Sequence, residues 1–313
     1  MKKTAFIFPG QGSQAVGMGK DLYDNYAEAK EVFDLADKAL GYKISDICFN
    51  GPEEALKQTK NTQPAILTTS LACLAVLKKE LGIKPAATAG HSLGEYGALY
   101  TAGVLTLEDA VKITGIRASL MDEAAKTTNG SMAAVIALSE DVINKVLAEL
   151  SKDGKISVAN YNCPGQIVIT GEKHLIEKSV DLLKEKGAKR VIELAVSGAF
   201  HSELMKGAAA KFAEKIKTFD FKNGKIDVYE NTDAKPVTDG QELKERVVKQ
   251  IYSSVCWTKT IQNMLADGIE EFIELGTGKV LAGLNKKIDA NIKTYNIYDT
   301  DSLKAVINEI KGE

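Results

Sequence analysis

Residues 90–94, with the sequence GHSLG, have the spacing of a turn that exposes a serine nucleophile. The small residues at 84–89 predict a strand before this turn, and the chain from Leu93 to about Ala102 predicts a helix after it. Ser92 would then lie at a helix N-terminus, where free N–H groups favour the negative charge that develops during acyl transfer. Because the same spacing also occurs in ordinary turns, the segment predicts catalysis only together with a base.

Three histidines could supply that base. His91 adjoins Ser92, and neighbouring side chains on a turn point apart. His174 lies among charged residues at a predicted helix start, which is typical of a solvated side chain. His201 follows the apolar residues 198–200 at a predicted domain junction, where ligand clefts often form. A serine followed by a later histidine is also the chain order of α/β-hydrolase-like sites, so the pattern favours His201 as a base over a purely structural histidine.

Arg117 is one of three arginines in a lysine-rich chain, and it falls within an apolar helical stripe of Ala110, Ile113, Leu120 and Ala124. This spacing would turn the guanidinium inward, and a buried guanidinium needs an anionic partner. An internal aspartate or glutamate is the commoner partner. A substrate carboxylate is the functional alternative, because the planar guanidinium can bind it with two hydrogen bonds.

Strands and helices alternate along much of the chain, which predicts a parallel sheet covered by helices. We expect the strands of this α/β-hydrolase-like large domain at 4–8, 84–89, 225–229 and 270–274. We expect its helices at 21–40, from Thr62 to a stop at Gly82, and at 202–218, 243–251 and 257–267.

The middle of the chain has a different order of elements. Residues 131–196 predict strand, helix, strand, strand, helix and strand, which is the ferredoxin-like pattern. We therefore expect a ferredoxin-like small domain at 127–197, inserted into a large domain formed by 1–126 and 198–313.

Composition excludes several classes of protein. The chain has 313 residues, 44% of them hydrophobic and 26% charged, as in a globular protein, and its net charge of −2 argues against nucleic-acid binding through a broad basic surface. The first apolar run stops at Pro9, too early for a secretory signal, and no stretch approaches the roughly 20 apolar residues of a membrane helix. The four separated cysteines show no metal-binding pattern and predict free thiols, so we expect a cytoplasmic protein without metal.

The loop at 9–15 imitates a dinucleotide-binding fingerprint, since Gly10, Gly12 and Ala15 fit its spacing after a strand. A predicted helix stands where that motif needs a second strand. Aiming a backbone N–H at an oxyanion is therefore the better interpretation of this loop.

Taken together, these motifs resemble those of the malonyl-CoA:acyl carrier protein transacylases, the acyltransferase family of bacterial type II fatty acid synthesis. The resemblance extends over essentially the whole chain and rests on several motifs in one order. They are residues 8–14 (FPGQGSQ), 63–65 (QPA), 90–96 (GHSLGEY), Arg117 with Met121, 160–162 (NYN) with 164–166 (PGQ), 200–202 (FHS) and 276–284.

The resemblance implies a role for each matching residue. Ser92 would be the nucleophile and His201 its base, without an acidic third member. The backbone N–H groups of Gln11 and Leu93 would form the oxyanion hole, and Arg117 would bind the free malonyl carboxylate. Gln250 would orient His201 through its main-chain carbonyl. The substrate-binding residues would be Gln11, Arg117, Met121, Asn160, Phe200 and Gln250.

The implied reaction is a ping-pong transfer from malonyl-CoA, through a malonyl-serine ester, to the phosphopantetheine thiol of acyl carrier protein. The product would supply extender units for fatty acid synthesis. The resemblance also implies an enzyme that needs no bound cofactor, and we expect it to be a monomer. Two alternatives stay open. One is a serine hydrolase, which would pass the acyl group to water, and the other is a non-catalytic module that binds carrier protein.

Three residues depart from the family's usual pattern. Ala199 stands where proline is common, Asp122 where glutamine is frequent, and Cys256 where arginine is common. The last change removes a cation and puts in doubt any contact it would make near the site. Phe200 matches the malonyl-selective members, whereas methylmalonyl-selective relatives tend to have serine there.

Overall fold

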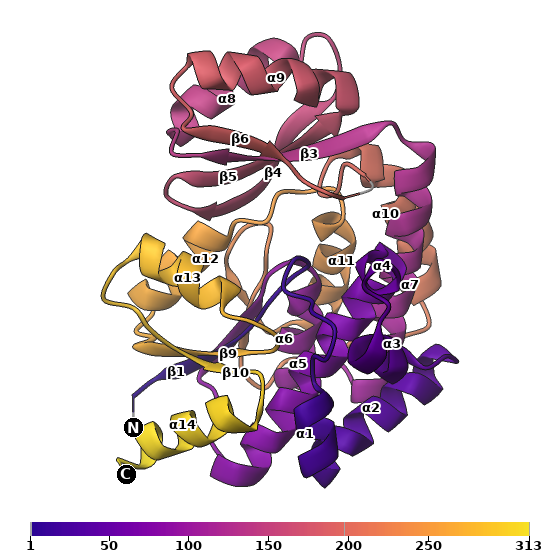
Figure 1. The fold of residues 1–313 in the computed structure, drawn as a ribbon, viewed down its shortest axis with the longest axis vertical. Helices are drawn as coiled ribbons and strands as arrows, with labels where there is room; N and C mark the ends of the chain where they lie inside the picture. The colour runs from indigo at the N-terminus through magenta and orange to yellow at the C-terminus, as the bar shows by residue number, and fades with distance from the viewer. Residues whose placement is uncertain (1, 197, 313) are drawn as a thin grey trace.

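The protein contains two separate β-sheets, seen in a computed structural model that describes residues 2–196 and 198–312 (Figure 1). The larger sheet has the strand order β10-β9-β1-β2-β7-β8, and the smaller has the order β4-β5-β3-β6. The smaller sheet lies with two helices at one end of the molecule, and the remaining helices surround the larger sheet. The predicted α/β fold with a second, small antiparallel sheet is therefore confirmed. The limits of the two domains stay a prediction. Residues 1, 197 and 313, which are among these limits, lie outside the residues that the structure describes.

The larger sheet is parallel except for its last strand. Its strands are β1 (Thr4–Phe8), β2 (Ala87–Gly90), β7 (Asp227–Tyr229), β8 (Pro236–Val237), β9 (Glu271–Leu275) and β10 (Lys293–Ile297). Side chains alternate between its two faces, so that Phe6 and Phe8 join one hydrophobic cluster while Ala5 and Ile7 join another. Because β1, β2 and β7 are parallel neighbours, their carboxyl ends meet at one edge, where ligands bind in such sheets.

Helices cover both faces of the larger sheet. They are α1 (Lys20–Asn25), α2 (Ala27–Leu40), α3 (Ile44–Asn50), α4 (Glu53–Lys57), α5 (Thr59–Leu81), α6 (Glu95–Thr101), α7 (Leu107–Thr127), α10 (Lys206–Ile216), α11 (Gly240–Gln250), α12 (Trp257–Ala266), α13 (Val280–Ile288) and α14 (Thr300–Lys311). The face of Phe6 packs with α5 and its neighbours, and the face of Ile7 packs with α12 and α13. Thr106 caps α7, since its side chain accepts the N–H of Asp109, and this fixes where the helix that carries Arg117 begins.

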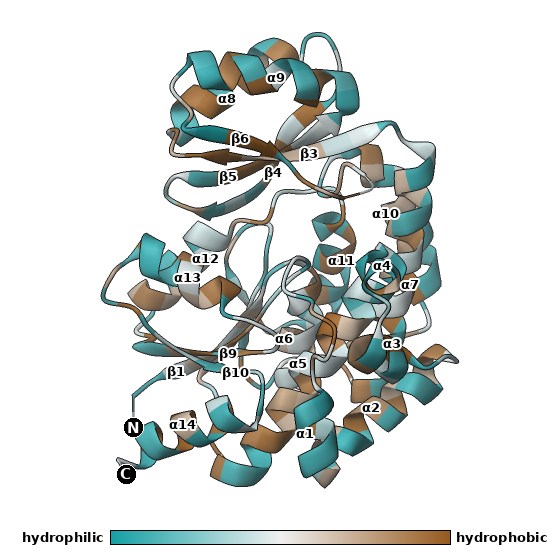
Figure 2. Cartoon of the chain, in the orientation of Figure 1, coloured by the Kyte–Doolittle hydropathy of each residue, from teal (hydrophilic) through white to brown (hydrophobic). Residues whose placement is uncertain are grey.

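The smaller sheet has the element order that the sequence predicts. It comprises β3 (Gly130–Ile136), α8 (Glu140–Leu150), β4 (Ile156–Cys163), β5 (Gln166–Glu172), α9 (Lys173–Glu185) and β6 (Arg190–Glu193), with every strand pair antiparallel. Ala133 and Val135 face α8 and α9, whereas Met132 and Ala134 face the core of the larger unit. Figure 2 shows hydrophobic residues on these strands and hydrophilic residues on the outer surfaces of both helices. Strands β3, β4 and β5 are thus mostly buried on both faces, whereas the edge strand β6 is mostly exposed.

Three predicted helices differ from the observed ones. The helix predicted over 21–40 is two helices, because the backbone is extended at Tyr26. The helix predicted from Thr62 begins at Thr59, which puts Pro64 inside α5 rather than at its start. The helix predicted over 202–218 opens with a 3₁₀ turn, η2 (Glu203–Met205), before α10.

All four cysteines are free thiols, as predicted. None of the helices in residues 2–196 and 198–312 is long and apolar enough to cross a membrane. Within the same residues, no group of three or more His, Cys, Asp or Glu side chains is arranged to hold a metal ion.

Candidate active site

Ser92 lies on a tight turn between β2 and α6, at the start of a 3₁₀ turn, η1 (Ser92–Gly94). Its φ of 52° lies in the left-handed region, which costs a residue with a Cβ roughly 1–2 kcal/mol. Two glycines let the chain approach itself closely here. A Cβ on Gly90 would lie 1.9 Å from the main-chain carbon of Gly94, and a Cβ on Gly94 would lie 2.2 Å from the carbonyl oxygen of Phe8. The predicted strand-turn-helix geometry therefore depends on both glycines.

His201 is hydrogen-bonded to this serine. Its Nε2 lies 2.8 Å from Ser92 Oγ, and its Nδ1 lies 2.9 Å from the carbonyl oxygen of Gln250 and 3.2 Å from that of Ser253. Since a carbonyl can only accept, Nδ1 carries the proton and Nε2 accepts from the serine hydroxyl. Burial, reinforced by the charge of Arg117, lowers the pKa of His201 to about 3. The ring is thus neutral at physiological pH, in the tautomer that can take a proton from the serine.

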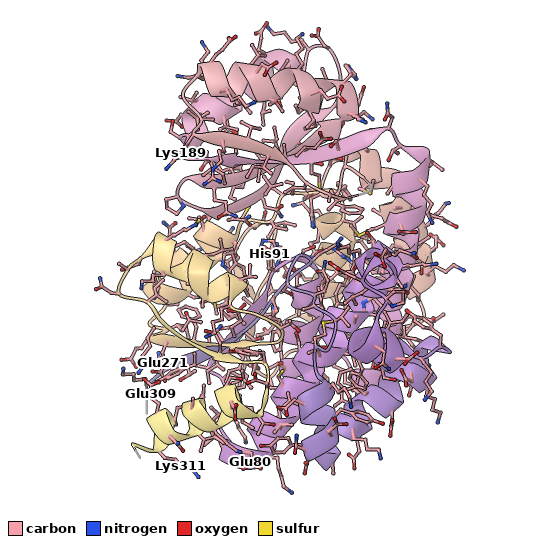
Figure 3. The ribbon with its side chains drawn as sticks, in the orientation of Figure 1. Glu80, His91, Lys189, Glu271, Glu309 and Lys311 are labelled. Carbon is pink, nitrogen blue, oxygen red and sulfur yellow. The ribbon has the colours of Figure 1, made fainter. Side chains whose placement is uncertain are left out.

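The other two histidines do not face the serine. His91 Nε2 lies 2.9 Å from Asn162 Oδ1 on β4, and its ring packs at a tilt against Trp257. Figure 3 shows His91 in the region between the two sheets. His174 is exposed and lies 3.7 Å from Glu172, as expected for a solvated side chain.

Arg117 is fully buried on α7 and contacts the serine directly. Its Nη1 donates to Gln63 Oε1 at 2.5 Å, and its Nη2 donates to Gln250 Oε1 at 2.8 Å and to Ser92 Oγ at 3.0 Å. These acceptors are all neutral, and its Nε has no acceptor among the described residues. The internal salt bridge that is the commoner fate of a buried arginine is therefore not formed in the described chain. The guanidinium keeps an uncompensated positive charge beside the serine.

A cleft of about 420 Å³ opens in front of Ser92 and His201, with walls from both the larger and the small unit. Of the predicted site residues it is lined by Gln11, Ser92, Met121, Asn160, Phe200 and His201, while Leu93, Arg117 and Gln250 are not part of the lining. The small unit contributes Met132, Asn160 and residues 194–196. Hollows of about 490 and 550 Å³ lie elsewhere on the surface, but none of the predicted site residues lines them.

Two backbone donors lie next to the serine. The loop after β1 lies against the Ser92 turn, since a Cβ on Gly10 would be 2.7 Å from the carbonyl oxygen of His91. Gln11 follows Gly10 in this loop, and Leu93 follows Ser92. In the described chain, neither the Gln11 nor the Leu93 N–H donates to another backbone carbonyl of a turn or loop. Their role as an oxyanion hole stays a prediction.

Sequence reasoning missed Asn231, which braces the serine turn. Its Oδ1 accepts the N–H of Ser92 at 2.7 Å, and its Nδ2 donates to the carbonyl oxygen of Gly90 at 2.6 Å. The side chain thus bonds to both arms of the turn and supports the left-handed conformation of Ser92. Asn231 comes two residues after β7, the strand beside β2, and a polar residue at that carboxyl end is the signal that could have identified it.

Glu95 and Gln63 were also missed. Glu95 lies fully buried in the first turn of α6, where its Oε2 accepts from Gln250 Nε2 at 2.8 Å and from the Asn231 N–H at 3.2 Å. Burial and, secondly, the charge of Glu230 raise the pKa of Glu95 to about 8. A carboxyl group in the otherwise uncharged helix after Ser92 is a signal for such a buried role. Gln63 sits in the quoted QPA motif, but that motif did not indicate its contact with Arg117.

The residues that depart from the family pattern have local partners. The thiol of Cys256 donates to the carbonyl oxygen of Thr232 at 3.3 Å, and Asp122 forms an ion pair with Lys126 at 2.6 Å. The carbonyl oxygen of Ala199 accepts from Ser202 Oγ at 2.6 Å, within the turn that carries His201.

Comparisons with known proteins identify the family of this chain. A family model described as an acyl transferase domain matches residues 5–299. A malonyl CoA-acyl carrier protein transacylase of Bacillus subtilis is 45% identical over 314 residues, covering 100% of this chain and 99% of that protein. One from Staphylococcus aureus is 46% identical over 305 residues, covering 97% of this chain and 98% of that protein.

Solved structures superpose closely on the whole chain. An acyl carrier protein S-malonyltransferase from Vibrio cholerae has a TM-score of 0.94 at 42% identity, covering 97% of this chain and 100% of that one. A type II PKS acyl-carrier protein in complex with its malonyl-transacylase gives a TM-score of 0.95 at 37% identity, covering 98% of this chain and 100% of the matched chain. With a serine and a neutral histidine at one cleft, a buried arginine in contact with that serine, and relatives of this identity over its full length, this chain belongs to the acyl transferase family, among the malonyl CoA-acyl carrier protein transacylases.

Proposed function

We propose that this chain transfers the malonyl group of malonyl-CoA to the phosphopantetheine thiol of acyl carrier protein and so supplies fatty acid synthesis. The observation that carries the proposal is the guanidinium of Arg117, fully buried and 3.0 Å from Ser92 Oγ. A malonyl thioester has its free carboxylate two carbons from the carbonyl that a serine would attack. The names of the relatives support the same donor and acceptor.

In the first half-reaction, Ser92 Oγ attacks the thioester carbonyl and its proton passes to His201 Nε2. The N–H groups of Gln11 and Leu93 stabilise the tetrahedral oxyanion, and each such donor is worth about 3 kcal/mol of barrier. The carbon–sulfur bond breaks, and the coenzyme A thiolate takes the proton from His201. A malonyl-serine ester and free coenzyme A remain, so the charges and protons balance.

In the second half-reaction, the carrier-protein thiol attacks this ester. Its proton passes to His201 Nε2, the bond between the acyl carbon and Ser92 Oγ breaks, and the serine oxygen takes the proton back. The hydrogen bond from His201 Nδ1 to the Gln250 carbonyl keeps the ring oriented in both steps. In this proposal the Gln250 carbonyl takes the place of an acidic third member, since it holds the Nδ1 proton and leaves the neutral ring free to accept at Nε2.

Selectivity for malonyl rests on Arg117 and on the cleft wall. Replacing malonyl by acetyl leaves the buried guanidinium without an anion, which costs several kcal/mol relative to the paired state. Phe200 and Met121 line the cleft where the acyl group would lie, and Gln11 and Asn160 contribute to its polar lining. No bound cofactor takes part in these steps. A cytoplasmic location and a monomeric state remain predictions.

Incubation with radiolabelled malonyl-CoA and holo acyl carrier protein tests the proposal. We expect label on the carrier protein with wild type and none with Ser92→Ala. We expect Arg117→Ala to lose most of the preference for malonyl-CoA over acetyl-CoA. Label released as free malonate, in place of label on the carrier protein, would instead favour the serine hydrolase, and a serine that no acyl-CoA labels would favour the binding module.

A further inference from the structure

Glu95 is hydrogen-bonded to two parts of the active-site network, Asn231 on one side and Gln250 on the other. Its Oε2 accepts the main-chain N–H of Asn231, whose side chain braces the Ser92 turn. The same oxygen accepts Gln250 Nε2, which also donates to the carbonyl oxygen of Ser92 at 2.9 Å. One carboxyl oxygen thus touches both the residue that supports the nucleophile and the residue that contacts Arg117.

The side-chain amide of Gln250 has only one orientation that suits its neighbours. Its Nε2 faces two acceptors, Glu95 Oε2 and the Ser92 carbonyl, and its Oε1 faces the donor Arg117 Nη2. A rotation that exchanged these atoms would place donor against donor at Arg117 and acceptor against acceptor at Glu95. The hydrogen bond from Gln250 Nε2 to Glu95 therefore helps to keep the amide in the orientation in which Oε1, and not Nε2, lies against Arg117 Nη2.

We propose that Glu95 is a positioning residue for malonyl selectivity: it holds the Gln250 amide in the orientation that presents Oε1 to Arg117 and thereby aims the guanidinium at the acyl group. The proposal rests on the proposed function, in which Arg117 binds the malonyl carboxylate. Keeping this carboxyl has a cost in stability, because it is fully buried and burial raises its pKa. Its other oxygen, Oε1, has no partner among the described residues, which adds to the cost of keeping it.

The test is the ratio of kcat/KM for malonyl-CoA to kcat/KM for acetyl-CoA. Glu95→Met keeps the volume and removes the acceptor, and we expect the ratio to fall about tenfold, the usual effect of losing one hydrogen bond to a carboxyl group. Glu95→Gln keeps an acceptor oxygen and is mostly isoelectronic at pH 7, because burial raises the pKa of Glu95 to about 8. It should restore most of the ratio. A general loss of folded enzyme would lower both rates together and leave the ratio unchanged.

Glu274→Gln is the matched control, since Glu274 is another fully buried carboxyl but accepts the N–H groups of Leu281 and Ala282 at the start of α13. It should leave the ratio as in wild type. If Glu95→Met does not fold, Glu95→Asp keeps the carboxyl but withdraws it from Gln250 by one methylene, and we expect the same fall.

A double-mutant cycle with Gln250→Ala asks whether Glu95 acts through the amide, because this variant keeps the main-chain carbonyl that His201 uses. In that background Glu95→Met should cause no further fall in the ratio. An additive fall, or an unchanged ratio in both Glu95→Met and Glu95→Asp, would overturn the proposal for Glu95. If Arg117→Ala also kept the malonyl preference, the proposed function itself would fail, so the two failures are distinguishable.

Discussion

The two sides of the cleft are built in different ways. The side formed by the larger sheet holds a continuous network of buried polar groups, in which Glu95, Arg117, Asn231 and Gln250 are each at most 1% exposed. The side formed by the small unit contributes Met132, Asn160 and residues 194–196, without a charged side chain in the described lining. In the proposed function, the larger unit therefore supplies the reacting and charged groups, and the small unit supplies one uncharged wall of the cleft beside them.

The difference also predicts how each side responds to substitution. In a buried polar network, removing one partner leaves another group unsatisfied, at a cost of about 1–3 kcal/mol. On the wall of a cleft, a truncated side chain mainly changes the fit to the substrate. Substitutions of the groups that hold Ser92 and His201 should therefore slow every acyl donor, and substitutions of Arg117 and Glu95 should change the choice between malonyl and acetyl. Substitutions in the small unit should instead change the size of the acyl group that is accepted.

The largest effect is expected for His201→Ala. Loss of the base that takes the proton from Ser92 should lower kcat by about 10²- to 10⁴-fold, as measured by malonyl transfer to carrier protein. His174→Ala, on the exposed surface of the small unit, is the matched control and should transfer at the wild-type rate. Equal losses in both variants would show that the histidine at the cleft has no special role.

A second comparison uses two asparagines, one from each side. Asn231→Ala removes both hydrogen bonds that brace the Ser92 turn, and transfer from malonyl-CoA and acetyl-CoA should fall together by about 10- to 100-fold. Asn162→Ala removes one contact to His91 from β4 and should cost less than tenfold. A larger loss for Asn162→Ala than for Asn231→Ala would contradict the division of roles between the two sides.

The wall of the small unit should control the size of the acyl group. Leu194→Ala enlarges the cleft, and kcat/KM for methylmalonyl-CoA should rise relative to malonyl-CoA by a few-fold, at most about tenfold. Rates of transfer for the two donors, measured side by side, check this. If the ratio of kcat/KM for malonyl-CoA to acetyl-CoA changed while the preference for acyl size did not, Leu194 would instead influence the position of Arg117.

The remaining prediction concerns stability and its dependence on pH. Burial raises the pKa of Glu95 from 4.5 to about 8, so between these values the folded protein holds a proton that the unfolded chain has released. The contribution of Glu95 to the free energy of unfolding is therefore fully present below pH 4.5 and is lost as the pH rises to 8. The free energy of unfolding of Glu95→Gln should therefore increase relative to wild type between pH 5 and 8, measured by urea denaturation.

Glu274 supplies the comparison for this last prediction, because burial raises its pKa to about 7 and it does not line the cleft. The gain in the free energy of unfolding for Glu274→Gln should level off at a pH about one unit lower than the gain for Glu95→Gln. A constant difference from wild type across the range would mean that neither carboxyl is protonated on folding.

The sequence predicts the parts of the site that depend on local spacing. The glycines around Ser92 impose a tight turn, and the helical period turns Arg117 inward, so both could be identified from neighbouring residues. Asn231 and Glu95 could not be identified in this way. The contact of Asn231 with Ser92 joins residues 139 positions apart and exists only because β7 lies beside β2 in the sheet.

The fold, too, could be predicted only where neighbouring residues form a clear pattern. The strands and helices of the small unit have clear alternating or helical patterns and are predicted to within a few residues. The edge strand β10, the two-residue strand β8 and the short helices α3 and α4 are not predicted, nor are α13 and α14. β10 reads Lys-Thr-Tyr-Asn-Ile, and such a polar strand is specified by its pairing with β9 rather than by its own composition.

The central claim is that Ser92 accepts the malonyl group and passes it to a thiol. Intact-mass analysis of the enzyme after brief incubation with malonyl-CoA, followed by peptide mapping, tests it most directly. We predict one malonyl adduct on the peptide that contains Ser92, lost when holo acyl carrier protein is added and recovered on its phosphopantetheine. An adduct on another residue, or an adduct at Ser92 that water removes while the carrier protein stays unmodified, would contradict the account.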